Sequence, residues 1–321
     1  MLTKFQGIIF AFILGVVCPG VIIGMLQKRV PPVSVEFSIC DSETYKNENV
    51  LDKISVLLQD GSVMIMEMND YLTCVVLQEM PANFELEALK AQAVVARTYT
   101  LRRKEYGGKH IDTAVCTESD CCQGFCLWDT YLDHGGKEEM AEKVKQAVEM
   151  TEDLVLVYNG ELIDATYFSC SGGRTEDAKA VWGTEIPYLK ATDSPGEEYA
   201  NYYVDTTTFT AAEFMDKLDL ELSVEPQIGN ILYTSGGGVD CITVNGTVFK
   251  GTEIRKKLGL RSTAFAIKIV ANTVIITTKG FGHRVGMSQY GADAMALEGN
   301  TFPEILAHYY QGTQLIHYNG N

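Results

Sequence analysis

The sequence predicts an α+β fold: a mixed helix and sheet core with a small inserted α+β subdomain, preceded by one N-terminal transmembrane helix. Three observations support this. Residues 5–27 carry no charged side chain, Asp-Gly and Asn-Gly hairpin signatures alternate with helical patterns, and residues 202–269 have strands and helices of their own. We therefore expect a membrane anchor at 1–30, a linker at 31–49, a core formed by 50–201 and 270–321, and an inserted subdomain at 202–269.

The apolar run at residues 5–27 is long enough to cross a bilayer and long for a signal peptide. No clear small-residue cleavage site precedes Lys28 and Arg29, so an uncleaved anchor is the better interpretation. Lys4 lies before the run and these two basic residues follow it, so the flanking charges do not decide the topology. The formal net charge of −16 argues against nucleic acid and against an anionic membrane surface as partners.

The first part of the core is expected to be a hairpin followed by two helices. Residues 54–68 alternate around an Asp-Gly pair, which is typical of a hairpin. The next segment predicts a short helix that is capped by Asn69 or Asp70 and ended by Pro81. Asn83 is the expected cap of a second helix, which has acidic residues in its first turn and a Gly-Gly pair at its end.

Glu79 is the candidate functional residue of this region. It is predicted at the C-terminal end of the first helix, among Val75, Val76 and Met80. The negative end of the helix dipole and the apolar neighbours both disfavour ionisation, so they raise the pKa of the carboxyl. A raised pKa is what a general acid needs near neutral pH. The alternative is a solvated glutamate at a helix end.

The cysteines suggest a metal site. Nine are present, and four of them form the pattern Cys116-x4-Cys121-Cys122-x3-Cys126, which His110 precedes. Thiolates and an imidazole at this spacing suit tetrahedral zinc. Adjacent cysteines in an extended chain point to opposite sides, so both bind one metal only if the loop turns between them. The alternative is disulfide pairing or free thiols. A zinc hydrolase is disfavoured because thiolate-rich sites are usually structural.

The other elements follow from hydrophobic period and turn signals. In chain order we expect a helix at 137–150, a hairpin at 154–157 and 162–168, a helix at 211–218, strands near 231–233 and 241–244, a helix at 252–258, a strand at 273–278, and helices at 292–297 and 302–310.

Two polar glycine-rich turns interrupt these elements. The first spans 169–175 and contains Ser171, Gly172 and Gly173. A turn of this kind before a polar helix start can hold an oxyanion or a sugar hydroxyl. In the second, at 280–291, glycines let a polymer or backbone approach closely. Three residues project hydrogen-bonding groups from it: His283, Ser288 and Gln289. The phosphate-loop and dinucleotide signatures are absent.

Three sequence blocks, taken in order, resemble the stage II sporulation protein D family. They are the Glu-Met-Pro block at 79–81 together with residues 87–98, the Ser-Gly-Gly-Arg-Thr turn at 171–175, and the Gly-His block that runs to the Tyr-Gly pair at 290–291. The resemblance covers most of the chain, and its first and third blocks are long and specific. The chain departs from the family pattern at Phe281 and Arg284, where tryptophan and glycine are usual.

The resemblance implies a membrane-anchored lytic transglycosylase that acts in forespore engulfment during sporulation. Such an enzyme cleaves the MurNAc-GlcNAc glycosidic bond of denuded peptidoglycan strands and forms 1,6-anhydro-MurNAc ends. Glu79 matches the catalytic glutamate of the family. The expected substrate-binding residues are Arg97, Tyr167, Ser171, Gly172, Gly173, His283, Ser288 and Gln289. Arg97 would bind the lactyl carboxylate, with a structural ion pair to Glu87 or Asp70 as the alternative.

Cofactors, partners and location are implied in the same way. Zinc, in a structural role that the chemistry does not require, would be bound by His110, Cys116, Cys121 and Cys122, with Cys126 and His134 as further candidates. The expected partners are peptidoglycan glycan strands, an amidase/endopeptidase of the stage II sporulation protein P type and a membrane protein of the stage II sporulation protein M type, but no nucleic acid. The catalytic domain would face the space between mother cell and forespore, outside the cytoplasm. The alternative function is a non-catalytic glycan-binding protein that stimulates a cell-wall amidase.

Overall fold

The computed structural model describes residues 53–221 and 225–318. The expected anchor at 1–30 and linker at 31–49 lie outside these residues. Among the residues that are described, no helix is long and apolar enough to cross a bilayer.

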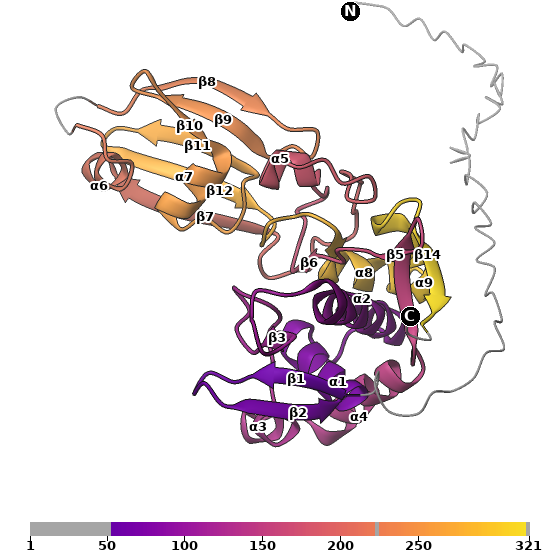
Figure 1. Cartoon of the computed structure of the whole chain (residues 1–321). Helices are drawn as coiled ribbons and strands as arrows, with labels where there is room; N and C mark the ends of the chain where they lie inside the picture. Colours follow the sequence, from indigo (N-terminus) through magenta and orange to yellow (C-terminus); the bar gives the residue numbers. More distant parts are fainter. Residues whose placement is uncertain (1–52, 222–224, 319–321) are drawn as a thin grey trace, which may run out of the picture. The chain divides into compact units, whose positions relative to one another are not determined.

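The core mixes helices with short strands, as the sequence predicts (Figure 1). Its elements are β1 (Lys53–Leu57), β2 (Val63–Glu67), α1 (Met68–Glu79), α2 (Leu86–Tyr106), β3 (Val115–Cys116), α3 (Trp128–Asp133), α4 (Glu138–Glu149), β4 (Leu154–Tyr158), β5 (Glu161–Leu162), β6 (Tyr167–Phe168), α5 (Ala178–Trp182), β13 (Met287–Ser288), α8 (Gln289–Leu297), α9 (Phe302–Tyr309) and β14 (Gln314–His317).

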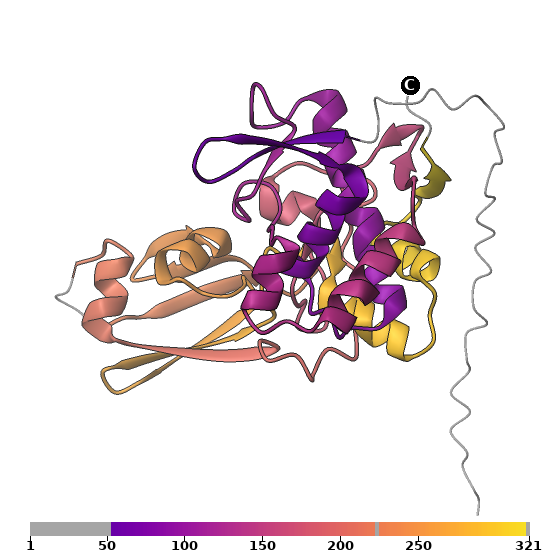
Figure 2. The same cartoon turned by 90° about the horizontal axis from the view of Figure 1, so that it is seen from below.

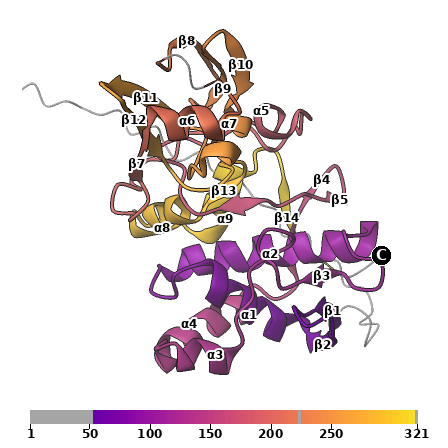
Figure 3. The same cartoon turned by 90° about the vertical axis from the view of Figure 1, so that its left-hand side faces the viewer.

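Helix α2 is the centre of the core. It contacts α1 and α4 on one side and α8 and α9 on the other, as Figure 3 shows. Every residue from Ala88 to Leu101 is buried, including Lys90, Gln92 and Arg97. A helix that is packed on all sides has no solvent face, so its polar residues must find partners inside the protein.

The ends of the first two helices depend on tertiary contacts as well as on the local sequence. Helix α1 ends at Glu79, and Met80 is extended, as expected for the residue before a proline. Helix α2 begins one residue after Glu85, not after Asn83. The backbone N–H of Glu85 donates to Oδ1 of Asp293 at 2.7 Å, so a distant carboxylate supplies the cap.

A short parallel pairing brings the two distant blocks of the core together. Strand β13 pairs with β6, with Met287 opposite Tyr167 and Ser288 opposite Phe168. Gly286, which precedes β13, has φ +83°, and a Cβ there would lie 2.0 Å from the carbonyl oxygen of Thr166. Only glycine permits this approach, which explains part of the glycine-rich pattern.

The inserted subdomain folds as a unit with its own apolar core, seen in salmon to orange in Figure 2. Its elements are β7 (Val204–Thr210), α6 (Ala211–Lys217), β8 (Ile228–Tyr233), β9 (Val239–Val244), β10 (Thr247–Lys250), α7 (Gly251–Leu258), β11 (Phe265–Val270) and β12 (Thr273–Lys279). They form two three-stranded sheets, in the orders β10-β9-β8 and β11-β12-β7.

The expected end of the insertion at residue 269 needs correction. Strand β12 pairs along its length with both β11 and β7, and Val274 and Ile276 belong to the apolar core of the insertion. The insertion therefore extends through Lys279, and the chain returns to the core only at the glycine-rich turn.

Candidate active site

Glu79 lies at a cleft of about 740 Å³ whose walls come from both the core and the insertion. Four of the residues expected from sequence line it together: Glu79, Tyr167, His283 and Gln289. The helix end positions the carboxyl, because α1 stops at Glu79 and the chain then turns away as an extended segment.

The backbone of Gly124 forms a hydrogen bond with the Glu79 carboxyl. Its backbone N–H donates to Oε1 of Glu79 at 2.5 Å. A Cβ at position 124 would lie 2.7 Å from Cγ of Gln78 and 3.1 Å from Oε1 of Glu79. The close approach of the backbone to the carboxyl therefore depends on glycine.

The pKa of the Glu79 carboxyl is raised above its ordinary value, and burial is the main cause. Three hydrogen bonds act in the opposite direction by stabilising the ionised form. They come from the N–H of Gly124 and from the side chains of Tyr167 and Gln289. The pKa is thus raised, as expected from the sequence, and the cause is burial of the carboxyl.

Gln123 supports the site from inside the core. Its amide nitrogen donates to Oγ1 of Thr100 at 2.9 Å and to the hydroxyl of Tyr71 at 3.2 Å. The Thr100 hydroxyl itself donates to the carbonyl of Ala96, so it can only accept from Gln123. Oε1 of Gln123 therefore faces Tyr167, whose hydroxyl donates to it at 3.1 Å.

His283 is held as a neutral ring in the wall of the cleft. The N–H of Val285 donates to Nδ1 at 3.1 Å, and the ring also bonds to the backbone of Tyr167. Burial lowers the pKa of His283 to about 4, and the nearby charge of Arg255 acts in the same direction. The ring packs beside Trp182, with centroids 5.3 Å apart, and against Phe168 at 5.7 Å.

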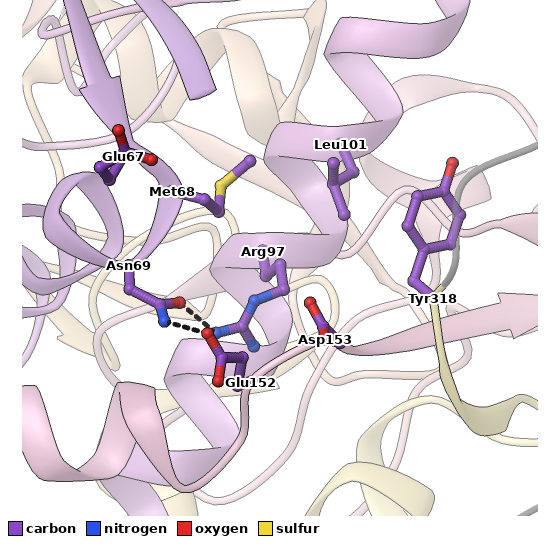
Figure 4. A pocket seen from close by; sticks show the side chains of 8 residues that line it. All are labelled: Glu67, Met68, Asn69, Arg97, Leu101, Glu152, Asp153 and Tyr318. Atoms are coloured by element: carbon purple, nitrogen blue, oxygen red, sulfur yellow. Dashed lines mark hydrogen bonds between the residues drawn. The ribbon is translucent and has the colours of Figure 1, made fainter. Parts of the chain in front are cut away.

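Arg97 does not lie in this cleft, so the expected contact with a substrate carboxylate is corrected. It is 2% exposed, and its guanidinium donates to the carbonyls of Thr151 and Val148 and to Oδ1 of Asn69. Figure 4 shows it in a separate pocket of about 200 Å³. The alternative ion pairs are not formed either, since Glu87 instead pairs with Lys90 at 2.6 Å.

The turn at Ser171, Gly172 and Gly173 also has a different role from the expected one. Ser171 is fully buried. The N–H groups of Ser171 and Gly172 donate to Oε2 of Glu197 at 2.7 and 3.2 Å, and the Ser171 hydroxyl donates to Oε1 at 2.8 Å. The turn does bind an anion, but the anion is a carboxylate of the protein itself. None of these three residues lines the cleft around Glu79.

Ser288 and Arg284 are buried and have structural roles. Ser288 caps helix α8, since its hydroxyl accepts from the N–H of Gly291, and it does not line the cleft. Arg284, which departs from the family pattern, is 2% exposed and pairs with the buried Glu176 at 3.4 Å. Its guanidinium also donates to the carbonyl of Gly236 in the insertion at 2.8 Å, so it ties the insertion to the core.

The expected metal ligands come together next to the cleft. The ligand atoms of His110, Cys116, Cys121 and Cys122 all lie within 4.8 Å of one another. Nε2 of the histidine is 3.5 and 3.6 Å from the sulfurs of Cys121 and Cys122, and these sulfurs are 3.9 Å apart. Zinc–sulfur bonds of about 2.3 Å in a tetrahedron require sulfur–sulfur distances of about 3.8 Å, so the cluster fits zinc.

The loop turns at Cys121 and Cys122, as it must if both of these adjacent residues bind one metal ion. The N–H groups of Cys121 and Cys122 both donate to the carbonyl of Glu118, at 3.0 and 2.8 Å. Cys126 lies apart, with its N–H bonded to the carbonyl of Cys74, and neither Cys126 nor His134 joins the cluster. Among the described residues the cysteines are those at 74, 116, 121, 122, 126, 170 and 241, and none of them forms a disulfide.

Sequence patterns did not single out Gln123, Gly124 or Arg255 as site residues. Gln123 and Gly124 lie inside the cysteine pattern, between Cys122 and Cys126, but no period or spacing marks them as neighbours of Glu79. Arg255 comes from helix α7 of the insertion, and only the fold brings it to the cleft.

Comparison with known proteins places the chain among sporulation proteins. A family model described as Stage II sporulation protein matches residues 59–158. The chain is 41% identical over 260 residues to Stage II sporulation protein D of Bacillus subtilis (strain 168), an alignment that covers 79% of this chain and 76% of that protein. It is 39% identical over 259 residues to the protein of the same name from Bacillus amyloliquefaciens, covering 79% and 75%. A Bacillus subtilis (strain 168) protein named Amidase enhancer is 29% identical over 303 residues, covering 76% of this chain and 40% of that protein.

The chain belongs to the stage II sporulation protein D family, as the three sequence blocks predict. This membership supports a role in sporulation.

Proposed function

We propose that this protein is a membrane-anchored lytic transglycosylase that cleaves the MurNAc-GlcNAc bond of denuded peptidoglycan strands during forespore engulfment. The observation that carries the proposal is Glu79, a carboxyl with a raised pKa at a cleft of about 740 Å³. A cleft of this size, with polar groups set between aromatic side chains, suits a segment of a polysaccharide. The family membership supplies the link to sporulation.

Glu79 acts first as a general acid. Burial raises the pKa of the carboxyl and so favours its protonated form, and the proton passes to the glycosidic oxygen as the bond from that oxygen to C1 of the muramic acid breaks. The donors from Gly124, Tyr167 and Gln289 stabilise the carboxylate that remains. The site thus favours the acid before the step and accommodates the anion after it.

Glu79 then acts as a base. The carboxylate takes the proton of the C6 hydroxyl, and the C6 oxygen forms a bond to C1 of the same sugar. The product is a 1,6-anhydro-MurNAc end, Glu79 is protonated again, and no water is consumed. One carboxyl is therefore sufficient, in contrast to the pair that glycoside hydrolases use.

We further propose that the cluster of His110, Cys116, Cys121 and Cys122 binds zinc in a structural role. Bound zinc would fix the loop that leads to Gly124, and the thiolate-rich ligand set suits a structural site. An amidase/endopeptidase that removes stem peptides and a membrane protein of the engulfment machinery are the proposed partners, on the extracytoplasmic side of the cell membrane.

The test is digestion of amidase-treated peptidoglycan by the full-length protein in detergent, with mass analysis of the products. We expect ends that are lighter by one water than ordinary reducing ends. Glu79→Gln should abolish them. Glu149→Gln is the matched control, because Glu149 is also the last residue of a helix but is exposed and does not line the cleft. Full product formation by Glu79→Gln, or ordinary reducing ends from the wild type, would overturn the proposal.

The second candidate is a non-catalytic glycan-binding protein that stimulates a cell-wall amidase. The similarity to a protein named Amidase enhancer favours it. Under this alternative the wild-type protein binds glycan and accelerates a purified amidase, while no anhydro ends form with any combination of partners. Anhydro ends that depend on Glu79 would exclude it.

A further inference from the structure

The cations of the cleft differ in how they are paired. Arg103 forms an ion pair with Asp164 at 3.1 Å and lies over the ring of Tyr99. The Lys109 ammonium donates to the carbonyl of Cys121. Arg255 forms no ion pair with a described residue, and its one hydrogen bond runs from Nε to the carbonyl of Leu260 at 3.3 Å, so neither terminal nitrogen is engaged.

The terminal nitrogens of Arg255 remain available to a ligand. Within residues 53–221 and 225–318 no carboxylate acts on its guanidinium, whose pKa is lowered by burial alone. A partly buried guanidinium without an anion is unfavourable, and buried charges in proteins are usually paired. Since Arg255 lines the same cleft as Glu79, the missing anion is expected on the molecule that occupies the cleft.

An exposed aromatic side chain lines the same cleft as this cation. Trp182, at the end of helix α5, is 44% exposed and lines the cleft, with its ring 5.3 Å from that of His283. The charge of Arg255 acts on the same histidine, so the guanidinium and the indole both have His283 as a neighbour in the cleft wall. A large exposed aromatic surface in a polar cleft suits the apolar face of a sugar ring.

We propose that Arg255 and Trp182 form a subsite for an acidic sugar, in which the guanidinium binds the carboxylate of a ring that stacks on the indole. The inference rests on the proposed function for the identity of the sugar. In a denuded strand the only carboxylate is the lactyl group of muramic acid. A stem peptide turns that carboxylate into a neutral amide, so this subsite selects strands from which the peptide has been removed. The insertion, which carries Arg255, thereby sets the specificity of a site whose acid lies in the core.

The test compares two glycans that differ in one group: denuded MurNAc-GlcNAc oligosaccharides, and the same oligosaccharides with the lactyl carboxylate converted to a methylamide. Binding is measured by calorimetry on the full-length protein in a Glu79→Gln background, so that cleavage does not interfere. We expect the carboxylate form to bind about 10- to 100-fold more tightly, the range typical of a hydrogen bond to a charged group. Arg255→Gln should reduce its affinity to that of the amide and leave the amide unchanged.

Two controls separate a contact from a general effect of charge. Lys256→Gln removes the same charge from the next, exposed position of α7 and should preserve the discrimination. Arg255→Lys keeps the positive charge but lacks the planar guanidinium, and it should lose part of the discrimination between the two glycans. Equal binding of the two glycans by the protein with Arg255 intact would overturn the proposal without any further variant. Anhydro products with equal binding would refute this subsite alone, whereas discrimination without anhydro products would refute the proposed reaction alone.

Discussion

Replacing Tyr167 with phenylalanine tests whether the Tyr167 hydroxyl lowers the pKa of Glu79. Burial raises the pKa of Glu79, and the Tyr167 hydroxyl is one of three donors that lower it. Removing that donor destabilises the ionised carboxyl, so the pKa of Glu79 should rise further. In the proposed reaction Glu79 must be protonated for the first step. We therefore expect kcat/KM to fall as pH rises through this pKa, and the falling limb to move to higher pH in Tyr167→Phe.

The size of the shift follows from the hydrogen bonds. A hydrogen bond to a charged group contributes about 1.5–3 kcal/mol, and one pH unit corresponds to about 1.4 kcal/mol. The same hydroxyl also serves Oε1 of Gln123 at 3.1 Å, so only part of its strength acts on Glu79. We therefore expect the midpoint of the falling limb to move up by about one pH unit.

The assay is the pH profile of kcat/KM for release of anhydro ends from denuded glycan. Tyr106→Phe serves as control, because Tyr106 is the exposed last residue of α2 and should not shift the profile. The absolute rate of Tyr167→Phe is also expected to fall, but the position of the limb is the diagnostic quantity. A limb that stays in place or moves to lower pH would refute the role assigned to Tyr167.

Three further predictions concern other parts of the site. Gly124→Ala should lower kcat about tenfold with little change in Tm, measured by product release and thermal unfolding, because the added methyl group displaces the Glu79 carboxyl. Cys121→Ser should lose bound zinc and lower Tm, whereas Cys126→Ser should keep zinc, as metal analysis of the purified proteins would show. Arg97→Met should cost about 3–5 kcal/mol of unfolding free energy in urea, since it orphans buried carbonyls, and should leave the preference for the carboxylate glycan unchanged.

The elements that depend on local sequence could be predicted well. The hairpin at Asp60-Gly61, the stop of α1 before Pro81 and the position of Glu79 at that helix end all follow from short-range rules. The boundary of the insertion could not be predicted in this way. Strand β12 belongs to the insertion because it pairs with β7, more than sixty residues earlier, and periodicity in one segment carries no information about such a partner.

Site residues whose partners lie far away in the sequence were also hard to predict. The sequence suggests that Arg97 binds the lactyl carboxylate of the substrate. In the structure α2 is packed on all sides, and the guanidinium of Arg97 donates instead to carbonyls at the end of α4. Ser171 and Gly172 did suggest an anion site, yet the sequence could not reveal that the buried Glu197 occupies it. In both cases the hydrogen-bond donors that were expected to bind a ligand bind acceptors of the protein itself. Only the fold brings these acceptors close.

The proposed reaction uses Glu79 first as an acid and then as a base, so both protonation states must be stabilised, and the surroundings of Glu79 provide for both. Tyr167 carries one hydroxyl proton and has two acceptors within reach, Oε1 of Gln123 and the Glu79 carboxylate. When Glu79 is protonated, the Tyr167 proton can stay with Gln123, and the Tyr167 oxygen can accept from Glu79. When Glu79 is ionised, rotation of the hydroxyl supplies a donor to the carboxylate. The amide of Gln123 keeps its orientation in both states, because Thr100 fixes its nitrogen. The exchange between acid and base therefore requires the rotation of one hydroxyl group and no movement of the backbone.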